Sequence, residues 1–225
     1  MNTSLSIPAE LTDRLLSLTD APEGTAVIGV AGAPGVGKST LVEALLREVN
    51  GAGDVETHRV AHVPMDGFHL SDRELGRLGL LQCKGAPDTF DARGYAALLA
   101  RLAAGHRAGV VYAPGFERTL EQPVAGDIPV FPAARAVLTE GNYLLLDRPE
   151  WQQVRAACTE VWYVEADEQT RKRQLLERHV RYGKADAAAE AWVQDVDEPN
   201  ARLVLDSRDG ADLVLRITGN QVVVR

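Results

Sequence analysis

The sequence of 225 residues predicts an α/β fold in three layers, with a mainly parallel and doubly wound sheet. Short apolar runs typical of buried strands alternate with longer stretches whose apolar residues recur at helical spacing. The chain contains 45% hydrophobic and 25% charged residues, which suits one sizeable core. We therefore expect a single domain over residues 1–225.

The expected elements follow one another in a regular order. A leading helix is expected over 8–18, and the strand-like runs are 26–31, 59–63, 136–139, 161–164 and 212–217. A Gly- and Pro-rich interval, 105–132, contains 110–112 and 119–121, which are expected to pair as a short hairpin. We expect this hairpin to belong to an excursion over about 67–132 that shapes a substrate pocket.

A phosphate-binding pattern lies between the first strand and a helix-like run over 41–49. Its letters, G-x-x-x-x-G-K-[ST], predict a three-layer P-loop NTPase fold. The glycines let backbone N–H groups turn toward phosphates, Lys38 supplies a positive charge, and the Ser39 hydroxyl can ligate Mg²⁺. The residues expected to bind a nucleoside triphosphate are Gly32, Ala33, Pro34, Gly35, Val36, Gly37, Lys38, Ser39 and Thr40.

Two carboxylates are expected at the carboxyl ends of strands, where ligands of such sheets gather. Asp66 directly follows the run ending at Met65, and it suits a general base or a magnesium ligand. A turn residue before Gly67 is the alternative. Glu140 follows the run 136–139 and is expected to hold Mg²⁺ through water, with helix capping as its alternative.

These segments resemble a known group of kinases. Residues 32–40, then Met65-Asp66-Gly67-Phe68-His69, then Glu140-Gly141-Asn142 are similar to type I pantothenate kinases, uridine kinases and phosphoribulokinases. The resemblance is strongest to the bacterial sugar-kinase-like or nucleoside-kinase-like branch. It implies ATP as the nucleotide, the residue at Asp66 as catalytic base, and Ser39 and Glu140 as residues attending the magnesium.

Two further segments extend the resemblance. Residues 87–91 resemble a uridine kinase P-D-x-F-D segment, in which Asp88, rather than Asp91, would hold a substrate hydroxyl. Capping of a helix near Arg93 is the alternative for both. A lid is expected over about 171–195, and its arginine at Arg178 is implied to contact the triphosphate and to stabilise the transition state. Weaker candidates in this basic stretch are Arg173 and Arg181, and a solvated helix face is the alternative.

The substrate side departs from the resemblance. The hairpin offers Phe116 and Arg118 where pantothenate kinases place a Tyr and a His, which leaves pantothenate in doubt as the substrate. Arg118 could bind an anionic or polyhydroxylated substrate, or pair with a surface acid. His69 could orient a substrate hydroxyl or finish a loop. Asn200 matches a substrate asparagine of pantothenate kinases, with a turn residue as the alternative.

Composition limits the partners. The formal net charge of -8 argues against nucleic acid as the main partner. No leader-like pattern and no run of eighteen apolar residues is present, so a cytoplasmic protein without a membrane partner is expected. The resemblance also suggests a homodimer.

The sequence thus predicts an ATP-dependent kinase that phosphorylates a hydroxyl of a small polar metabolite, such as a sugar, a nucleoside or a pantothenate-like compound. Asp66, Lys38 and Arg178 are its expected catalytic residues. The alternative is a nucleotide-dependent switch or metallochaperone that acts on a protein partner. No guanine-reading N-K-x-D or T-K-x-D segment occurs in the sequence, which disfavours this alternative.

Overall fold

A six-stranded sheet forms the centre of the protein. The computed structural model describes residues 5–20, 24–105 and 108–225. The strand order is β2-β5-β1-β6-β7-β8, with β1 (Ala26–Ala31), β2 (Val60–His62), β5 (Ala136–Gly141), β6 (Glu160–Ala166), β7 (Leu213–Thr218) and β8 (Gln221–Val224). The first five strands in this order are parallel, and β8 runs antiparallel to β7. All five expected strands are therefore present.

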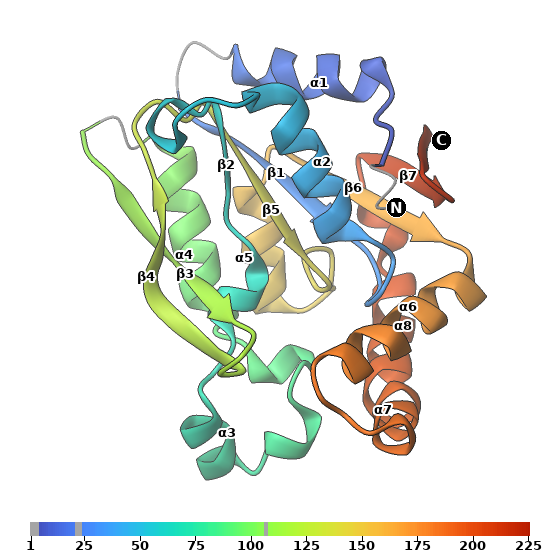
Figure 1. Ribbon diagram of the computed structural model, residues 1–225. Helices are drawn as coiled ribbons and strands as arrows, with labels where there is room; N and C mark the ends of the chain where they lie inside the picture. Colours follow the sequence, from blue (N-terminus) through green and yellow to red (C-terminus); the bar gives the residue numbers. More distant parts are fainter. Residues whose placement is uncertain (1–4, 21–23, 106–107) are drawn as a thin grey trace.

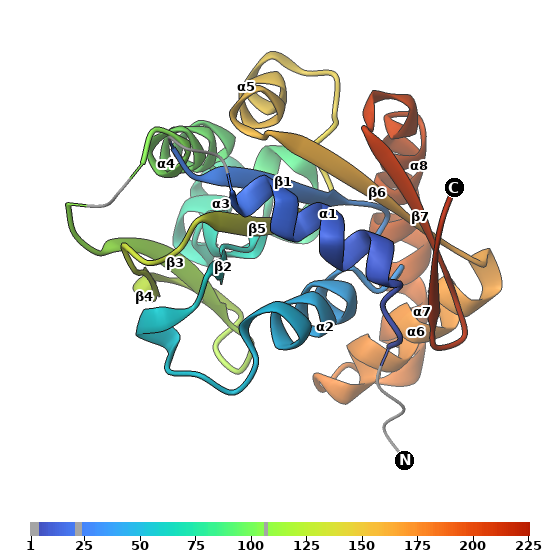
Figure 2. The same cartoon turned by 90° about the horizontal axis from the view of Figure 1, so that it is seen from above.

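Helices cover both faces of this sheet, as the three-layer prediction requires. Figure 2 shows α2 (Lys38–Asn50) on one face and α4 (Ala92–Ala103) with α5 (Pro149–Ala157) on the other. The leading helix α1 (Ala9–Thr19) packs against α2 at one end of the sheet. The predicted α/β fold with a mainly parallel, doubly wound sheet is confirmed. Because α4 also packs on β1, only part of the interval 67–132 projects from the layers.

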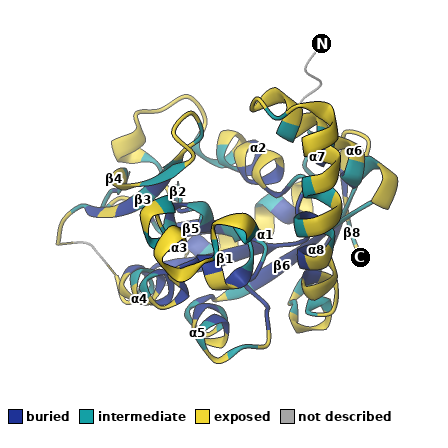
Figure 3. Ribbon diagram, turned by 90° about the horizontal axis from the view of Figure 1, so that it is seen from below, coloured by how far each residue is buried: buried dark blue, intermediate teal, exposed yellow. Residues whose placement is uncertain are grey.

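The core lies along the middle strands. Every residue of β1 is buried, and Val27, Ile28 and Val30 are fully inaccessible. Figure 3 shows β1, β5 and β6 as buried strands, while α3 (Asp72–Leu78) and α7 (Asp186–Trp192) present exposed faces. Burying one such aliphatic side chain stabilises a fold by roughly 1.5–3 kcal/mol. A parallel sheet buried on both faces explains why these strands read as continuous apolar runs.

The hairpin is longer than expected, and the position of its second strand was predicted wrongly. Its strands are β3 (Val111–Glu117) and β4 (Gln122–Val130), and residues 118–121 form the turn between them. The Glu117 carboxylate accepts hydrogen bonds from the Thr119 N–H at 2.9 Å and its hydroxyl at 2.8 Å. Local side-chain bonds of this kind favour a turn over a strand. Glu121 completes the turn with a φ of 52°.

The final strand β8 was not predicted. It pairs with β7 through a turn at Gly219-Asn220, and Gly219 has a φ of 59°. A Gly-Asn pair between two apolar runs is a recognised hairpin signal, so the sequence did contain the evidence.

The carboxyl ends of the parallel strands lie at one end of the sheet, and several helices and the hairpin tip pack around this end. Figure 1 shows α3, the hairpin tip and the helices α6 (Glu168–Arg181), α7 and α8 (Glu198–Leu205) gathered there, opposite α1. A π-helical turn, Val193–Asp197, joins α7 to α8. Within the described part of the chain, no helix is long and apolar enough to cross a membrane.

Candidate active site

The phosphate-binding pattern forms a loop between β1 and α2. Gly35 and Gly37 adopt φ angles of +83° and +94°, which side chains with a Cβ rarely tolerate. Gly37 is the N-cap of α2, and no side chain caps the first turn. The first N–H groups of an α-helix have no partner within the helix, so they are available to an anion. The local conformation therefore suits phosphate binding.

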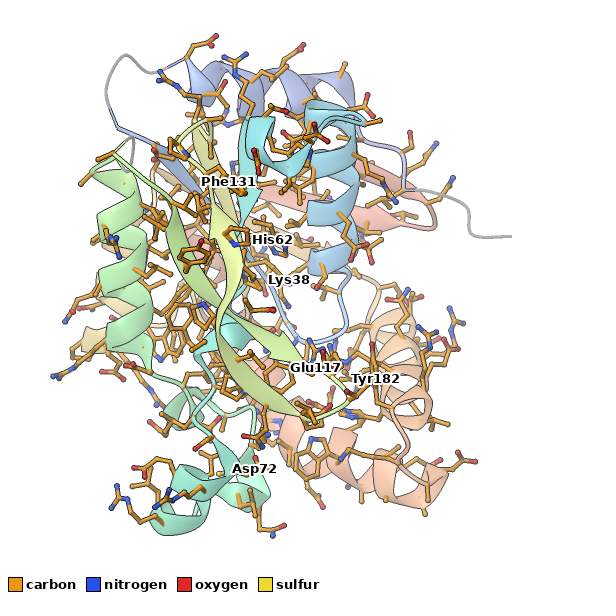
Figure 4. All side chains as sticks on the ribbon, turned by 60° about the vertical axis from the view of Figure 1, so that its left-hand side comes forward. Lys38, His62, Asp72, Glu117, Phe131 and Tyr182 are labelled. Carbon is orange, nitrogen blue, oxygen red and sulfur yellow. The ribbon has the colours of Figure 1, made fainter. Side chains whose placement is uncertain are left out.

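Lys38 is the first residue of α2 and is buried (Figure 4). Its Nζ donates to the carbonyl oxygens of Gly32 at 2.9 Å and Ala33 at 3.1 Å, and to Asn142 Oδ1 at 2.7 Å. Burial lowers the pKa of Lys38 to about 8. The ammonium group is therefore charged at neutral pH, but it is held by neutral acceptors in a poorly solvated position.

Ser39 and Glu140 lie against each other beside the loop. The register of β1 and β5 pairs Val30 with Glu140, which brings the end of β5 to the start of the loop. Ser39 Oγ donates to Glu140 Oε1 at 2.7 Å. Burial raises the pKa of Glu140, and nearby Lys38 partly opposes this effect. Two oxygen side chains in this position match the ligand preference of Mg²⁺.

Asp66 lies in a 3₁₀ turn, Met65–Phe68, directly after β2. Its Oδ2 accepts a hydrogen bond at 2.5 Å from Arg118 Nη2, on the hairpin. Burial alone would raise the pKa of Asp66, but the positive charges of Arg118 and Arg178 and the hydrogen bond from Arg118 outweigh it and lower the pKa. Arg118 therefore pairs with the expected base, and not with Glu117 or Glu121 on its own hairpin.

The His69 ring is held between two aromatic rings. Its centroid lies 4.0 Å from that of Phe90 and 4.9 Å from that of Phe116. His69 Nδ1 lies 2.8 Å from the Asp66 carbonyl oxygen. A carbonyl oxygen only accepts, so we assign the proton to Nδ1. Burial lowers the pKa of His69, which leaves a neutral ring whose Nε2 can accept a hydrogen bond.

Asp66 and His69 line one pocket, which we call the central pocket. The residues that line this pocket come from the loop region, the hairpin, α6 and α8. Figure 4 shows the hairpin tip, near Glu117, beside the end of α6, near Tyr182. Of the predicted site residues, those that line the central pocket are Pro34, Asp66, His69, Arg118, Arg178 and Asn200. Asn200 is buried at 6% exposure, and neighbouring Asp197 binds His179 Nε2 at 2.7 Å.

Lys38 and Ser39 line a second pocket, which we call the loop pocket. It is lined by residues 35–40 of the loop and α2, by α6, and by the β7–β8 turn at Gly219 and Asn220. Arg178 lines both pockets, and Arg181 lines the loop pocket. Arg173 is exposed and lines neither pocket, although it belongs to the same helix. Residues 171, 174, 178 and 181 are three or four positions apart and share one face of α6, and Arg173 lies on a different face.

The two acids of the segment 87–91 lie elsewhere. Asp88 is exposed and pairs with Arg148 at 3.0 Å, and it lines neither pocket. Asp91 is the N-cap of α4, where its Oδ1 accepts from the Gly94 N–H at 2.8 Å. The arrangement thus gives Asp91 the capping role that was its alternative, because a short acid before a helix satisfies an N–H group of the first turn.

Two residues that contact the loop were not assigned a role from sequence. Asn142 belongs to the segment 140–142 that carries the resemblance, and its Oδ1 accepts a hydrogen bond from Lys38 Nζ. Arg171 is the first residue of the expected lid, and it is buried and donates to the Pro34 carbonyl oxygen. The helical spacing of Arg171 from Leu175 and Arg178 was the one signal that could have placed it on the inner face of α6.

Comparison with known proteins agrees with this geometry. The family described as methylmalonyl Co-A mutase-associated GTPase MeaB matches residues 6–70, a stretch that contains the loop and Asp66. A Schizosaccharomyces pombe protein named "Putative uridine kinase" is 35% identical over 169 residues, which are 73% of this chain and 71% of the relative. A Leifsonia xyli protein named pantothenate kinase is 32% identical over 222 residues, with 88% of this chain and 67% of the relative covered.

A solved structure is similar along nearly the whole chain. It is titled as a "putative fructose transport system kinase" from Silicibacter sp. TM1040, with 36% identity and a TM-score of 0.80. The match covers 92% of this chain and 97% of that chain. These three relatives match 73% or more of the chain and are named as uridine, pantothenate and fructose transport kinases, while the GTPase match is limited to residues 6–70. The chain belongs to the P-loop kinases of the pantothenate kinase and uridine kinase group, and it is an ATP-dependent small-molecule kinase.

Proposed function

We propose that this kinase transfers the γ-phosphoryl group of ATP to a hydroxyl of a small polar metabolite. The main support is the position of the Asp66 carboxylate in the central pocket, near Arg178, which also lines the loop pocket. The Asp66 carboxylate, a proton acceptor, therefore lies next to the site where the triphosphate is expected to bind. Phosphoryl transfer depends mainly on such positioning and on electrostatic stabilisation.

Asp66 is the proposed general base. Arg118 occupies its Oδ2, so the remaining oxygen is the one that accepts the proton of the acceptor hydroxyl. The acceptor oxygen then forms its bond to the γ-phosphorus as the bond to the ADP oxygen breaks, and ADP leaves. His69, through Nε2, and Asn200 are proposed to orient the acceptor. The lowered pKa keeps Asp66 ionised at neutral pH.

Positive charge on both sides of the transferred group is proposed to stabilise it. Lys38 at the loop and Arg178 on α6 provide this charge, and Arg181 extends it along the loop pocket. Ser39 and Glu140 are the residues that would hold Mg²⁺, which neutralises phosphate charge when bound. In the part of the chain that the structure describes, no group of three or more Asp, Glu, His or Cys side chains is arranged to hold a metal ion.

The charge pattern of the central pocket favours an uncharged, polyhydroxylated acceptor such as a sugar. Arg118 is paired with Asp66, and Lys84 is paired with Asp72 at 2.6 Å. These cations are therefore already compensated, whereas an acid such as pantothenate needs a cation of its own. The Phe116 ring supplies an apolar face beside these groups. The name of the Silicibacter relative is in line with a sugar acceptor.

Several finer expectations remain proposals. We propose a single kinase domain over 1–225, with a substrate-side part at about 67–132 and a lid at about 171–195. We also propose that the protein forms a homodimer and is located in the cytoplasm. The alternative of a nucleotide-dependent switch rests on the family match over residues 6–70.

A panel of acceptors tests the proposed function. ADP release from MgATP is measured with fructose, ribose, uridine, cytidine, pantothenate and sugar acids, for the wild type and for Asp66→Asn. Asp20→Asn is the matched control, because Asp20 also pairs with an arginine, Arg59, but on the exposed surface. We expect one acceptor to stimulate turnover, and Asp66→Asn alone to abolish the stimulation. Slow hydrolysis that no acceptor stimulates and that Asp66→Asn leaves unchanged would favour the switch.

A further inference from the structure

Arg171 is a buried cation at the base of α6 that the proposed mechanism does not use. Its side chain and backbone together are only 5% exposed. Nη1 donates to the Pro34 carbonyl oxygen at 3.3 Å, and Nη2 binds Glu198 Oε1 on α8. A guanidinium removed from water needs acceptors in fixed places, so both contacts constrain where it lies.

The backbone of Arg171 also lies directly against the phosphate loop. A Cβ at Gly35 would come within 2.8 Å of the Arg171 carbonyl oxygen. The corner formed by Pro34 and Gly35 therefore packs against one residue of α6, which contacts Pro34 through its guanidinium and lies close to Gly35 through its carbonyl group. Movement of this corner requires movement of α6 as well.

Glu198 fixes the guanidinium in turn. Its carboxylate also binds Lys172 Nζ at 3.0 Å. Burial raises the pKa of Glu198, but its bonds to Arg171 and Lys172 outweigh this effect and lower the pKa. Glu198 is therefore an anion that holds two cations of α6. It is the first residue of α8, the helix that also carries Asn200 in the wall of the central pocket.

We infer that Arg171, anchored by Glu198, is a positioning residue that sets the direction of the peptide group between Pro34 and Gly35. In a planar trans peptide the C=O and the following N–H point to opposite sides. Holding the Pro34 carbonyl oxygen on Arg171 therefore aims the Gly35 N–H away from α6, toward the inside of the loop where a phosphate oxygen binds. The inference rests on the proposed function only in that this loop binds the triphosphate.

Nucleotide affinity tests the inference without any acceptor. MgADP binding is measured by calorimetry for the wild type and for Arg171→Met, Arg171→Lys and Glu198→Gln. Glu198 keeps Lys172 as a partner in the arginine variants, so no buried carboxylate is left without a cation. The matched control is Arg208→Met, because Arg208 also pairs with a glutamate, Glu165, and neither residue lines the central pocket or the loop pocket.

We expect Arg171→Met to weaken MgADP binding about tenfold, Arg171→Lys to recover part of the loss, and Glu198→Gln to fall between Arg171→Met and the wild type. The control should stay within about twofold. Binding by folded Arg171→Met within about twofold of the wild type would overturn the inference, and so would an equal loss in Arg208→Met. Failure of the kinase proposal appears instead in the acceptor panel, which measures whether an acceptor stimulates turnover and not how tightly MgADP binds.

Discussion

The cost of burying the Lys38 ammonium group is large enough to measure as a function of pH. The pKa of Lys38 is lowered from its ordinary value of 10.5 to about 8, and burial is the main cause. Since each pKa unit is worth about 1.4 kcal/mol, the charged form costs the folded state about 3 kcal/mol. Lys38→Met removes this cost, together with the hydrogen bonds that Lys38 donates to Gly32, Ala33 and Asn142.

The sign of the pH dependence follows from the order of the two pKa values. The folded-state pKa lies below the unfolded one, so the cost is fully present below pH 8 and is relieved as the pH rises from 8 toward 10.5. The hydrogen bonds lost in Lys38→Met change the free energy of unfolding by the same amount at both pH values. The free energy of unfolding of the wild type, relative to Lys38→Met, should therefore increase by about 2 kcal/mol between pH 7 and pH 9.5.

Reversible urea unfolding at the two pH values measures this difference. Groups other than Lys38 titrate in both proteins and largely cancel. Lys172→Met is the control, because contacts with Glu168 and Glu198 raise the pKa of Lys172, and its difference from the wild type should not change over this range. A wild-type to Lys38→Met difference that is the same at both pH values would refute the reasoning from burial. It would mean that the three neutral acceptors keep Lys38 charged as easily as water does.

Three other predictions follow from the site. Arg118→Gln removes the cation that opposes burial at Asp66, so the pKa of Asp66 should rise and the acidic limb of the kcat profile should move to higher pH; an unmoved limb would show that Arg118 does not tune the base. Gly35→Ala places a Cβ against the Arg171 carbonyl oxygen at a φ of +83°, which should cost about 1–3 kcal/mol of stability and lower the melting temperature; a wild-type melting curve would contradict this. Glu140→Gln keeps an acceptor for the neighbouring hydroxyl but loses the charge, so half-maximal activity should require several-fold more Mg²⁺, and an unchanged requirement would exclude Glu140 from the metal site.

Much of the fold was predictable because its signals are local. The five parallel strands are short apolar runs, of which β1, β5 and β6 are largely buried. The phosphate loop is one contiguous segment whose glycines take the backbone angles that the turn requires. The turn of the hairpin was misplaced because a single side chain, Glu117, fixes it through bonds to Thr119. Apolar patterning carries no information on such a bond.

The sequence by itself determined the layered α/β architecture, the loop with Lys38 and Ser39 at the start of the helix that follows it, and the positions of Asp66 and Glu140 near strand ends. Each of these depends on residues that are close together in the chain, where backbone geometry and burial act directly. Only the tertiary structure decided that Arg118 pairs with Asp66, 52 residues away, and that Arg171 reaches Pro34, 137 residues away. Such pairings depend on the length of the hairpin and on how α6 packs against the loop, because two side chains meet only when the elements between them have fixed their relative positions.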